Sequence, residues 1–465
     1  MQPPRSALDL IRDHGGPELA ERLCHLDRVR DSRPRDEMIA GPDRTASVDA
    51  DVVFMGGGLS LLIAAELARF GVRVVVLERA RAGSAHREWN ASAEELVPLV
   101  EAGIVDRTEL DELIVARYRE GVCSFHGGAP HPVKGVLDHA VDAGGLLEKV
   151  RAVAEARGVR FLDHASVTAI GAGSSSVRVG FGRSEIVARL AVDARGASSP
   201  YATADLVCPT VGGVLRGLRF AADVGDVLVT TEHAEEGRQH IWEGFPGRPG
   251  ELTVYLFHYA RAHERRERGE LLSLYARFFE TIGAYKAGDP TLVRPTFGFI
   301  PGWSRLVPAP AGPSPRIVLV GDAAARHSPL TFCGFGSMLR TFRPIAAALA
   351  DAVDRGRPPP SPLLDDEDVH AWTGLLARVM ASGALRGSSL NALLDDAFGS
   401  LEEMGNESFA ALLKDRMGAR AFVGFLRRTA ARHPSVYGEV MKALGPMKMA
   451  RWGVSLARGA LAGGA

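Results

Sequence analysis

The chain has 465 residues, enough for a large hydrophobic core and for roughly two or three domains. Its 55 Lys and Arg residues almost balance its 56 Asp and Glu residues, and 7% of residues are aromatic, so the composition argues against a protein that binds nucleic acid. No apolar run approaches the ~18 residues of a membrane span, and no cleavable apolar signal opens the chain. Because Cys24, Cys123, Cys208 and Cys333 lack metal-ligand or redox-motif spacing, we expect a cytoplasmic protein.

Changes in the hydrophobic pattern divide the chain into four regions. Residues 1–44 are polar with apolar residues at helical spacing, which predicts a helical leader. Residues 45–205 and 300–350 contain apolar strands that alternate with helices, which predicts one discontinuous α/β domain. Residues 206–299 consist mainly of short strands between turns and predict an antiparallel sheet. Residues 351–465 predict a helical C-terminal part.

Two segments inside the first domain carry local predictions. Residues 93–119 are expected to be helical, because apolar residues recur there at helical spacing. The alternating runs "SVRVGFG" and "EIVARLAVDARG" follow one another and predict an antiparallel hairpin.

The segment "DADVVFMGGGLSLLIAAELARFGVRVVVLERA" has the pattern of a βαβ unit with a glycine turn between the first strand and the helix. Glycines in this place let backbone N–H groups approach a pyrophosphate, and Glu78 lies 22 residues after Gly56, where a carboxylate binds ribose hydroxyls. Leu61 replaces the third glycine of the usual motif, and a tight turn in an α/β core is the alternative interpretation. The expected nucleotide contacts are Gly56, Gly57, Gly58, Ser60, Glu78 and Arg79.

Two later strand ends indicate that the nucleotide is FAD. "AVDARGASSPY" ends a strand at Asp193 and Gly196, and "RIVLVGDAAARHSP" ends another at Asp322. Asp322 is expected to accept hydrogen bonds from ribityl hydroxyls, although it also suits a helix N-cap. The small residues of "TFCGFG" predict a flat surface for the isoalloxazine ring, formed by Gly334, Phe335 and Gly336.

In this order and spacing, the three motifs resemble the flavoprotein superfamily of p-hydroxybenzoate-hydroxylase type, and more narrowly the Cru-type bacterial lycopene cyclases. The resemblance covers about residues 50–350 and is carried by "GGGLSLLIAAELARFGVRVVVLERA", "REWNASAEELVPLVEAGI", "VDARGASSP", "RQHIWEGFP", "TVYLFHY" and "GDAAARHSPLTFCGFGSMLR". It implies a discontinuous FAD-binding, Rossmann-like βαβ domain, an antiparallel β substrate domain laid over the flavin, and a helical C-terminal part. Ser60 and Cys333 stand where that family has glycines, and Cys333 is expected to be a small buried hydrophobe near the flavin.

The resemblance implies a reaction on a large apolar substrate, a polyene or isoprenoid, in which reduced FAD stabilises a carbocation and a carboxylic acid protonates a terminal double bond. Such an acid must stay protonated near neutral pH, which apolar burial achieves. Glu243 is the first candidate because Trp242, Phe245 and Pro246 flank it, although an outward-facing strand carboxylate is the alternative. Glu88 and His327 are the other candidate catalytic residues, with a salt bridge and a turn hydrogen bond as their respective alternatives.

Two other functions remain open from the sequence. A FAD-dependent monooxygenase that epoxidises or hydroxylates an apolar substrate needs few catalytic side chains, so the sequence hardly argues against it. A non-catalytic flavin-binding pathway partner is the third possibility, favoured only by Ser60 and Cys333. Because the chain has no second glycine fingerprint, NAD(P)H is expected to dock only transiently as reductant, or an external reductase supplies electrons. A halogenase is disfavoured, since no Trp-x-Trp-x-x-Pro element occurs.

The C-terminal tail mixes apolar and basic residues and raises the question of a peripheral membrane contact. Met441, Leu444, Met447, Met449, Trp452 and Leu456 alternate with Lys442, Lys448, Arg451 and Arg458. A basic, apolar segment with a Trp suits a membrane interface. A helix packed on its own protein is the alternative, because the Gly-Pro pair at 445–446 interrupts the periodicity.

Overall fold

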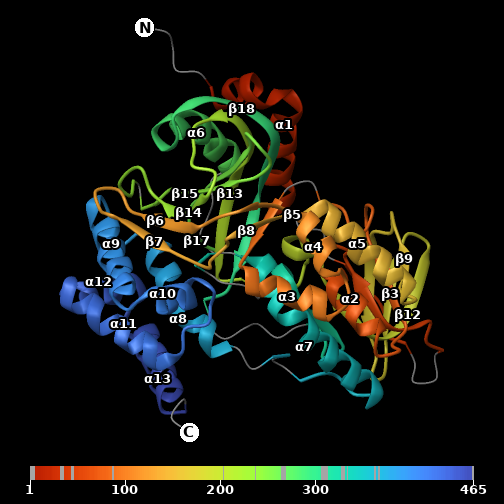
Figure 1. The fold of residues 1–465 in the computed structure, drawn as a ribbon. Coiled ribbons are helices and arrows are strands. Elements are labelled where there is room, and N and C mark those ends of the chain that lie inside the picture. The colour runs from red at the N-terminus through yellow and green to blue at the C-terminus, as the bar shows by residue number, and fades with distance from the viewer. Residues whose placement is uncertain are drawn as a thin grey trace.

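The structure is a computed structural model, and it describes residues 6–31, 36–42, 47–85, 88–202, 204–235, 237–262, 269–304, 313–325, 330–331, 333–360, 363–364 and 367–462. Figure 1 shows an α/β region on the right, a region of long strands covered by two helices at the top, and a helical region at the lower left. The predicted α/β class, with parallel and antiparallel sheets and a helical C-terminal part, is confirmed.

The first sheet is the centre of the α/β region. Its strands are β1 (Glu37–Met38), β2 (Ala50–Met55), β3 (Val74–Leu77), β9 (Arg160–Leu162), β10 (Val167–Ala172), β11 (Val177–Phe181), β12 (Ser184–Asp193) and β19 (Ile317–Leu319). Five of them run parallel in the order β19-β12-β2-β3-β9. Every residue of β2 and β3 is buried, as expected for parallel strands covered on both faces. The predicted hairpin is confirmed as the antiparallel pair β11–β12.

The second sheet is mainly antiparallel and lies over the first domain. Its strands are β6 (Glu120–Ser124), β7 (Pro130–Val133), β13 (Leu206–Leu218), β14 (Val224–Val229), β15 (Ile241–Pro246), β16 (Leu252–Phe257), β17 (Ala260–Arg261) and β18 (Gly288–Gly302). Their order is β17-β13-β16-β15-β14-β6-β7, with β18 on the other side of β13. Prolines at positions 290, 295 and 301 of the long strand β18 lack N–H groups and so protect this outer edge from pairing with another chain.

Helices cover both sheets. The first sheet packs against α2 (Leu61–Ala68), α3 (Ala93–Glu101), α4 (Arg107–Leu113), α5 (Ala143–Ala156) and α7 (Gly334–Asp354). One face of the second sheet packs against α1 (Ala7–Asp31) and α6 (Glu270–Tyr285). Its other face shares a core with α8 (Glu367–Met380), α9 (Ser388–Glu403), α10 (Asn406–Leu413), α11 (Ala419–Arg432), α12 (Val436–Leu444) and α13 (Pro446–Ala462).

Two local expectations need correction. Residues 93–119 do not form one helical stretch, because Gly103 adopts a φ of 61° just after α3, and the chain continues as α4 and then strand β5 (Ile114–Arg117). Strand β5 joins β4 (Glu88–Ala91) and β8 (His139–Asp142) in a three-stranded sheet. Strands β6 and β7 fall in the segment assigned to the first domain, yet β6 pairs with β14 of the second sheet. No helix among the described residues is long and apolar enough to cross a bilayer.

Two histidines fasten helix α9 to its neighbours through both ring nitrogens. His131 on β7 lies 2.9 Å from Asp395 and 3.1 Å from Glu402. His433, which follows α11, lies 2.9 Å from Asp396 and 3.0 Å from Glu439, and Arg432 lies 4.0 Å from Asp396. A neutral imidazole has a single N–H, so His433 donates to both of its carboxylates only when it is protonated.

We expect the contribution of His433 to stability to disappear in alkaline solution. Burial lowers the pKa of His433, but hydrogen bonds to Asp396 and Glu439 outweigh this and raise it above the ordinary 6.5. The stabilisation is therefore complete below pH 6.5 and is lost as the pH rises through the folded-state pKa. Urea midpoints of the native chain and His433→Gln should differ at pH 6 and converge at pH 9; a constant difference would contradict the assignment.

Candidate functional site

A cavity of about 380 Å³ lies between the first sheet and the second. One wall is formed where the parallel strands β2, β12 and β19 end, the edge at which such sheets bind ligands. The opposite wall comes from β13, β15, β16 and β18 of the second sheet. The first wall is lined by Gly58, Ser60, Ala194, Gly196, Val320, Gly321, Asp322, Gly334, Phe335 and Met338, and the second by Cys208, Thr210, Glu243, Phe245, Tyr255, Phe257 and Ile300.

The three glycines after β2 differ in what surrounds them. A Cβ on Gly56, whose φ is 110°, would lie 2.5 Å from the carbonyl oxygen of Ala194, and a Cβ on Gly57 would lie 2.6 Å from the Cβ of Ala82. Both are therefore required by packing of the protein against itself. A Cβ on Gly58 would meet no protein atom within 4 Å, and Gly58 lines the cavity. Gly58 alone thus leaves open space for a ligand to approach the backbone.

Glu78 closes β3 and binds the glycine turn. Its Oε2 accepts the N–H of Gly57 at 2.8 Å, and its Oε1 accepts the N–H of Ala80 at 3.0 Å. Each carboxylate oxygen has a second acceptor position, so ribose hydroxyls fit here. Ser60 donates to the Gly56 carbonyl at 3.1 Å and lines the cavity, whereas Arg79 is exposed at the surface.

At the ends of β12 and β19, the structure separates two expected flavin contacts. Asp193 is fully buried, does not line the cavity, and accepts hydrogen bonds from Arg195 and from Ser199. Asp193 therefore positions the turn, and its expected contact with the cofactor stays a prediction. Gly196, with a φ of 62°, and Asp322 do line the cavity, and they lie next to each other on its first wall.

Helix α7 begins at the cavity wall. Gly334 and Phe335 in its first turn line the cavity, and the free N–H groups of a helix N-terminus favour negative charge nearby. Gly336 does not line the cavity. A Cβ at this position would lie 2.7 Å from the buried carboxylate of Glu95. Glu95 pairs with Arg340 of the same helix. The small residue at 336 is thus needed by this ion pair, and its expected contact with the flavin stays a prediction.

Glu243 is the acidic residue of the apolar wall. It lies on β15 and faces the cavity, whereas its neighbour Trp242 packs on the opposite face of the sheet. Its Oε1 is buried without a hydrogen-bond partner among the described residues. Burial raises the pKa of Glu243 well above its usual value. A protonated carboxyl group is therefore favoured at neutral pH, as proton donation requires.

The side chains that surround Glu243 on the same wall were not predicted as site residues from the sequence. Tyr255 on β16 is paired directly with Glu243 in the sheet, and Phe257 lies two residues further on. Cys208 and Thr210 on β13 repeat this spacing. Side chains two apart on a strand share a face, so the alternation in "TVYLFHY" was the available signal. Cys333 was expected to be buried but is only partly so, packed against the apolar core, and its surroundings raise the pKa of its thiol, which keeps it protonated.

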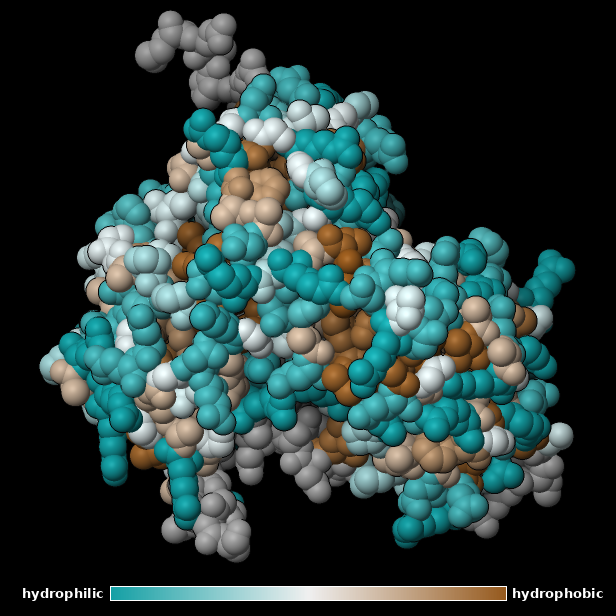
Figure 2. All heavy atoms as spheres, viewed as in Figure 1, coloured by the Kyte–Doolittle hydropathy of each residue, from teal (hydrophilic) through white to brown (hydrophobic). Residues whose placement is uncertain are grey.

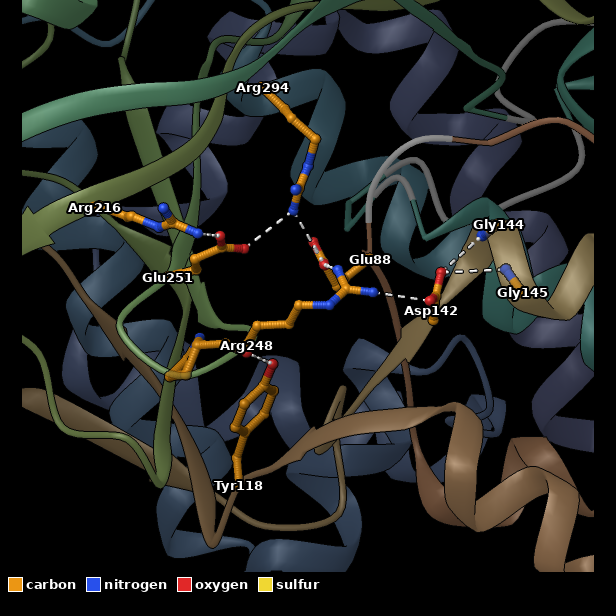
Figure 3. A network of polar contacts seen from close by, with 10 residues as sticks. Glu88, Tyr118, Asp142, Gly144, Gly145, Arg216, Arg248, Glu251 and Arg294 are labelled. Carbon is orange, nitrogen blue, oxygen red and sulfur yellow. Dashed lines mark hydrogen bonds and ion pairs between the residues drawn. The ribbon is translucent and has the colours of Figure 1, made fainter.

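Glu88 lines the cavity but is held in ion pairs, as Figure 3 shows. Its Oε1 lies 2.6 Å from Arg248 and 3.3 Å from Arg294. Arg294 also contacts Glu251 at 3.1 Å, and Arg248 contacts Asp142 at 2.8 Å. These contacts agree with the salt-bridge alternative for Glu88, whose catalytic role stays a prediction. The third candidate, His327, lies outside the described residues.

The fold is shared with solved flavin-dependent enzymes, although no protein-family model and no curated protein matches the sequence. A geranylgeranyl bacteriochlorophyll reductase-like protein from Thermoplasma acidophilum is 15% identical, with a TM-score of 0.60 over 85% of this chain and 99% of its own. Halogenase PltM, solved with phloroglucinol and FAD, is 13% identical, with a TM-score of 0.55 over 89% and 94%. Diels-Alderase PyrE3 is 20% identical, with a TM-score of 0.52 over 80% and 81%.

The residues at and beside the first wall fit FAD. Gly58 leaves room for a pyrophosphate and Asp322 lines the cavity with a carboxylate, while Glu78 lies outside the cavity lining, bound to the N–H of Gly57 in the adjoining turn. We predict that Gly58→Ala lowers FAD retention but changes the unfolding free energy by only about 0.5 kcal/mol. Gly56→Ala is expected to cost about 1–3 kcal/mol, because it strains a left-handed backbone against Ala194. The FAD-to-protein ratio and thermal unfolding of both variants check this; equal FAD retention in native chain and Gly58→Ala would contradict it.

Proposed function

We propose that the protein is a FAD-dependent enzyme that cyclises a large apolar polyene or isoprenoid-like substrate, as in lycopene cyclases, with Glu243 as the acid. The observation that carries the proposal is a carboxyl group of raised pKa, facing an apolar cavity wall, opposite a wall that fits FAD. Phe245, Phe257 and Ile300 give this wall an apolar surface suited to a hydrocarbon chain.

Each wall has a separate task in this reaction. Gly58, Glu78, Gly196, Asp322 and the first turn of α7 would hold FAD, which in its reduced, anionic form would supply negative charge that stabilises a carbocation on the substrate. Glu243 donates its proton from the carboxyl group to a terminal C=C carbon. The ring C–C bond then forms, and a ring carbon loses a proton that restores the carboxyl group of Glu243, so that the product has the composition of the substrate. The surrounding apolar side chains exclude water that would otherwise trap the cation.

The fold is compatible with several flavoenzyme reactions, and one neighbour supports a cyclisation. PyrE3 is named as a Diels-Alderase, and a Diels–Alder reaction closes a ring without net redox change. At 20% identity this neighbour supports the capacity of the fold and no more. A FAD-dependent monooxygenase that acts on the same apolar substrate is the competing proposal. In either proposal, NAD(P)H docks transiently and reduces the flavin.

The test is an anaerobic assay of the FAD-loaded protein with lycopene in liposomes or micelles. FAD is reduced with dithionite in one arm and with NADPH in the other, and products are separated by chromatography and weighed by mass spectrometry. A cyclised product of unchanged mass, formed without oxygen, is expected. A product heavier by one oxygen atom that forms only after air is admitted would replace the cyclase by the monooxygenase. Tightly bound FAD that neither NADPH nor dithionite reduces would favour the non-catalytic flavin-binding partner, whereas no product in either condition with reducible FAD would rule out lycopene and direct the assay to other apolar substrates.

A further inference from the structure

Exposed apolar side chains concentrate on the last two helices. Seven large hydrophobic residues are exposed among the described residues, and four of them lie on α12 and α13: Tyr437 (54% exposed), Met441 (42%), Met447 (86%) and Val454 (53%). Tyr437 and Met441 are four residues apart, and Met447 and Val454 are seven apart, so each pair lies on one side of its helix. In Figure 2, hydrophobic residues show among hydrophilic ones at the lower left, where Figure 1 places these helices.

The opposite sides of the two helices are packed against the protein. Ala443 on α12 and Trp452 and Leu456 on α13 are buried, and the Trp452 ring lies 6.1 Å from that of Phe422 on α11. For Trp452, the structure therefore agrees with the alternative of a helix packed on its own protein. The exposed apolar residues of α12 and α13 take no part in the hydrophobic cores that the described residues form.

Positive charge concentrates on the same end of the molecule. Residues 416–465 contain nine Lys and Arg residues and one acid, Glu439, whereas the preceding 415 residues contain 46 basic and 55 acidic residues. Five of these cations are exposed and form no ion pair with a described residue: Arg427, Arg428, Lys442, Arg451 and Arg458. On α13, Arg451 lies between Met447 and Val454, and Arg458 follows Val454. The successive spacings of four, three and four residues place all four side chains on the same side of the helix.

We propose that α12 and α13 form a membrane-binding surface for bilayers that contain anionic lipid. This surface is defined by Tyr437, Met441, Met447 and Val454 together with Lys442, Arg451 and Arg458. The apolar side chains enter the boundary between headgroups and acyl chains, and the cations contact lipid phosphates. Nucleic acid would use the cations but would leave Met447 and Val454 uncovered, since aliphatic side chains offer no ring for base stacking. The proposal does not depend on the chemistry proposed for Glu243.

The test measures co-sedimentation of the full chain with vesicles of phosphatidylcholine alone or mixed with phosphatidylglycerol. Binding to the mixed vesicles only is expected. The double substitution Arg451→Gln and Arg458→Gln should weaken vesicle binding roughly thirtyfold, because each cation near an anionic surface strengthens binding about fivefold. Met447→Ser with Val454→Ser should weaken it roughly tenfold or more through lost apolar burial. Val97→Ser on α3, which alters a residue that is 49% exposed, is the matched control and should bind as the native chain does.

Unchanged circular dichroism and urea midpoints will show that the variants remain folded, because all four substituted side chains are exposed. Absence of binding to the mixed vesicles, or equal binding to neutral ones, would overturn the proposal. Vesicle binding that survives both double substitutions would also overturn it, by placing the contact elsewhere. Binding of a single-stranded oligonucleotide that only the Arg substitutions weaken, without vesicle binding, would replace the membrane by nucleic acid.

Discussion

Glu243→Gln is expected to lose activity and gain stability at the same time. A positioned acid contributes about 10²–10⁴-fold to a rate, so cyclisation should fall by at least about 100-fold while FAD stays bound. Because burial raises the pKa of Glu243 in the folded state, the native chain loses stability as the pH rises above the unfolded value of 4.5. The amide cannot ionise, so the variant should be more stable than the native chain at pH 8.

Three measurements check this prediction. Product formation gives the rate, thermal unfolding at pH 5 and pH 8 gives the stability, and infrared absorption of a protonated carboxyl group at pH 7 should disappear in Glu243→Gln. Glu280→Gln is the control, because Glu280 is exposed on α6 of the same region. Full activity in Glu243→Gln would remove this residue from the mechanism without affecting the FAD site.

Arg195→Gln is expected to be the most destabilising of the substitutions considered. The side chain of Arg195 bridges Asp193, which is fully buried, and Asp36, whose side chain is 5% exposed, with contacts of 2.8 Å to each. Removing the guanidinium leaves two buried carboxylates without a countercharge, which costs about 3–5 kcal/mol. The neighbouring Gly196 lines the cavity, so weaker FAD retention should accompany the loss.

Urea unfolding and the FAD-to-protein ratio of purified Arg195→Gln measure both effects. Arg119→Gln serves as the control, because Arg119 and Asp223 form an exposed pair 3.7 Å apart that is worth at most about 1 kcal/mol. If the two variants unfold at the same urea concentration, the buried triad of Asp36, Asp193 and Arg195 does not stabilise the fold as its geometry indicates.

Much of the fold was predictable because its signals are local. The buried strand, glycine turn and helix at residues 49–80 lie within one segment, and the hairpin β11–β12 follows from alternation over a few residues. The order of the strands required pairings between distant segments. Strand β6, for example, joins β14 of the second sheet, about a hundred residues further along the chain.

For the candidate site, the sequence by itself determined the chemical groups, and the tertiary structure decided which of them are available. The glycines after β2, Glu78 and Asp322 stand at strand ends, and that position follows from local pattern. Whether a carboxylate is neutral, paired or exposed depends on residues brought near it by folding. Glu88 meets arginines at positions 248 and 294, Asp193 meets Arg195 and Ser199, and Glu243 meets apolar neighbours. Burial and charge pairing set protonation, and both arise from contacts that a linear pattern does not contain.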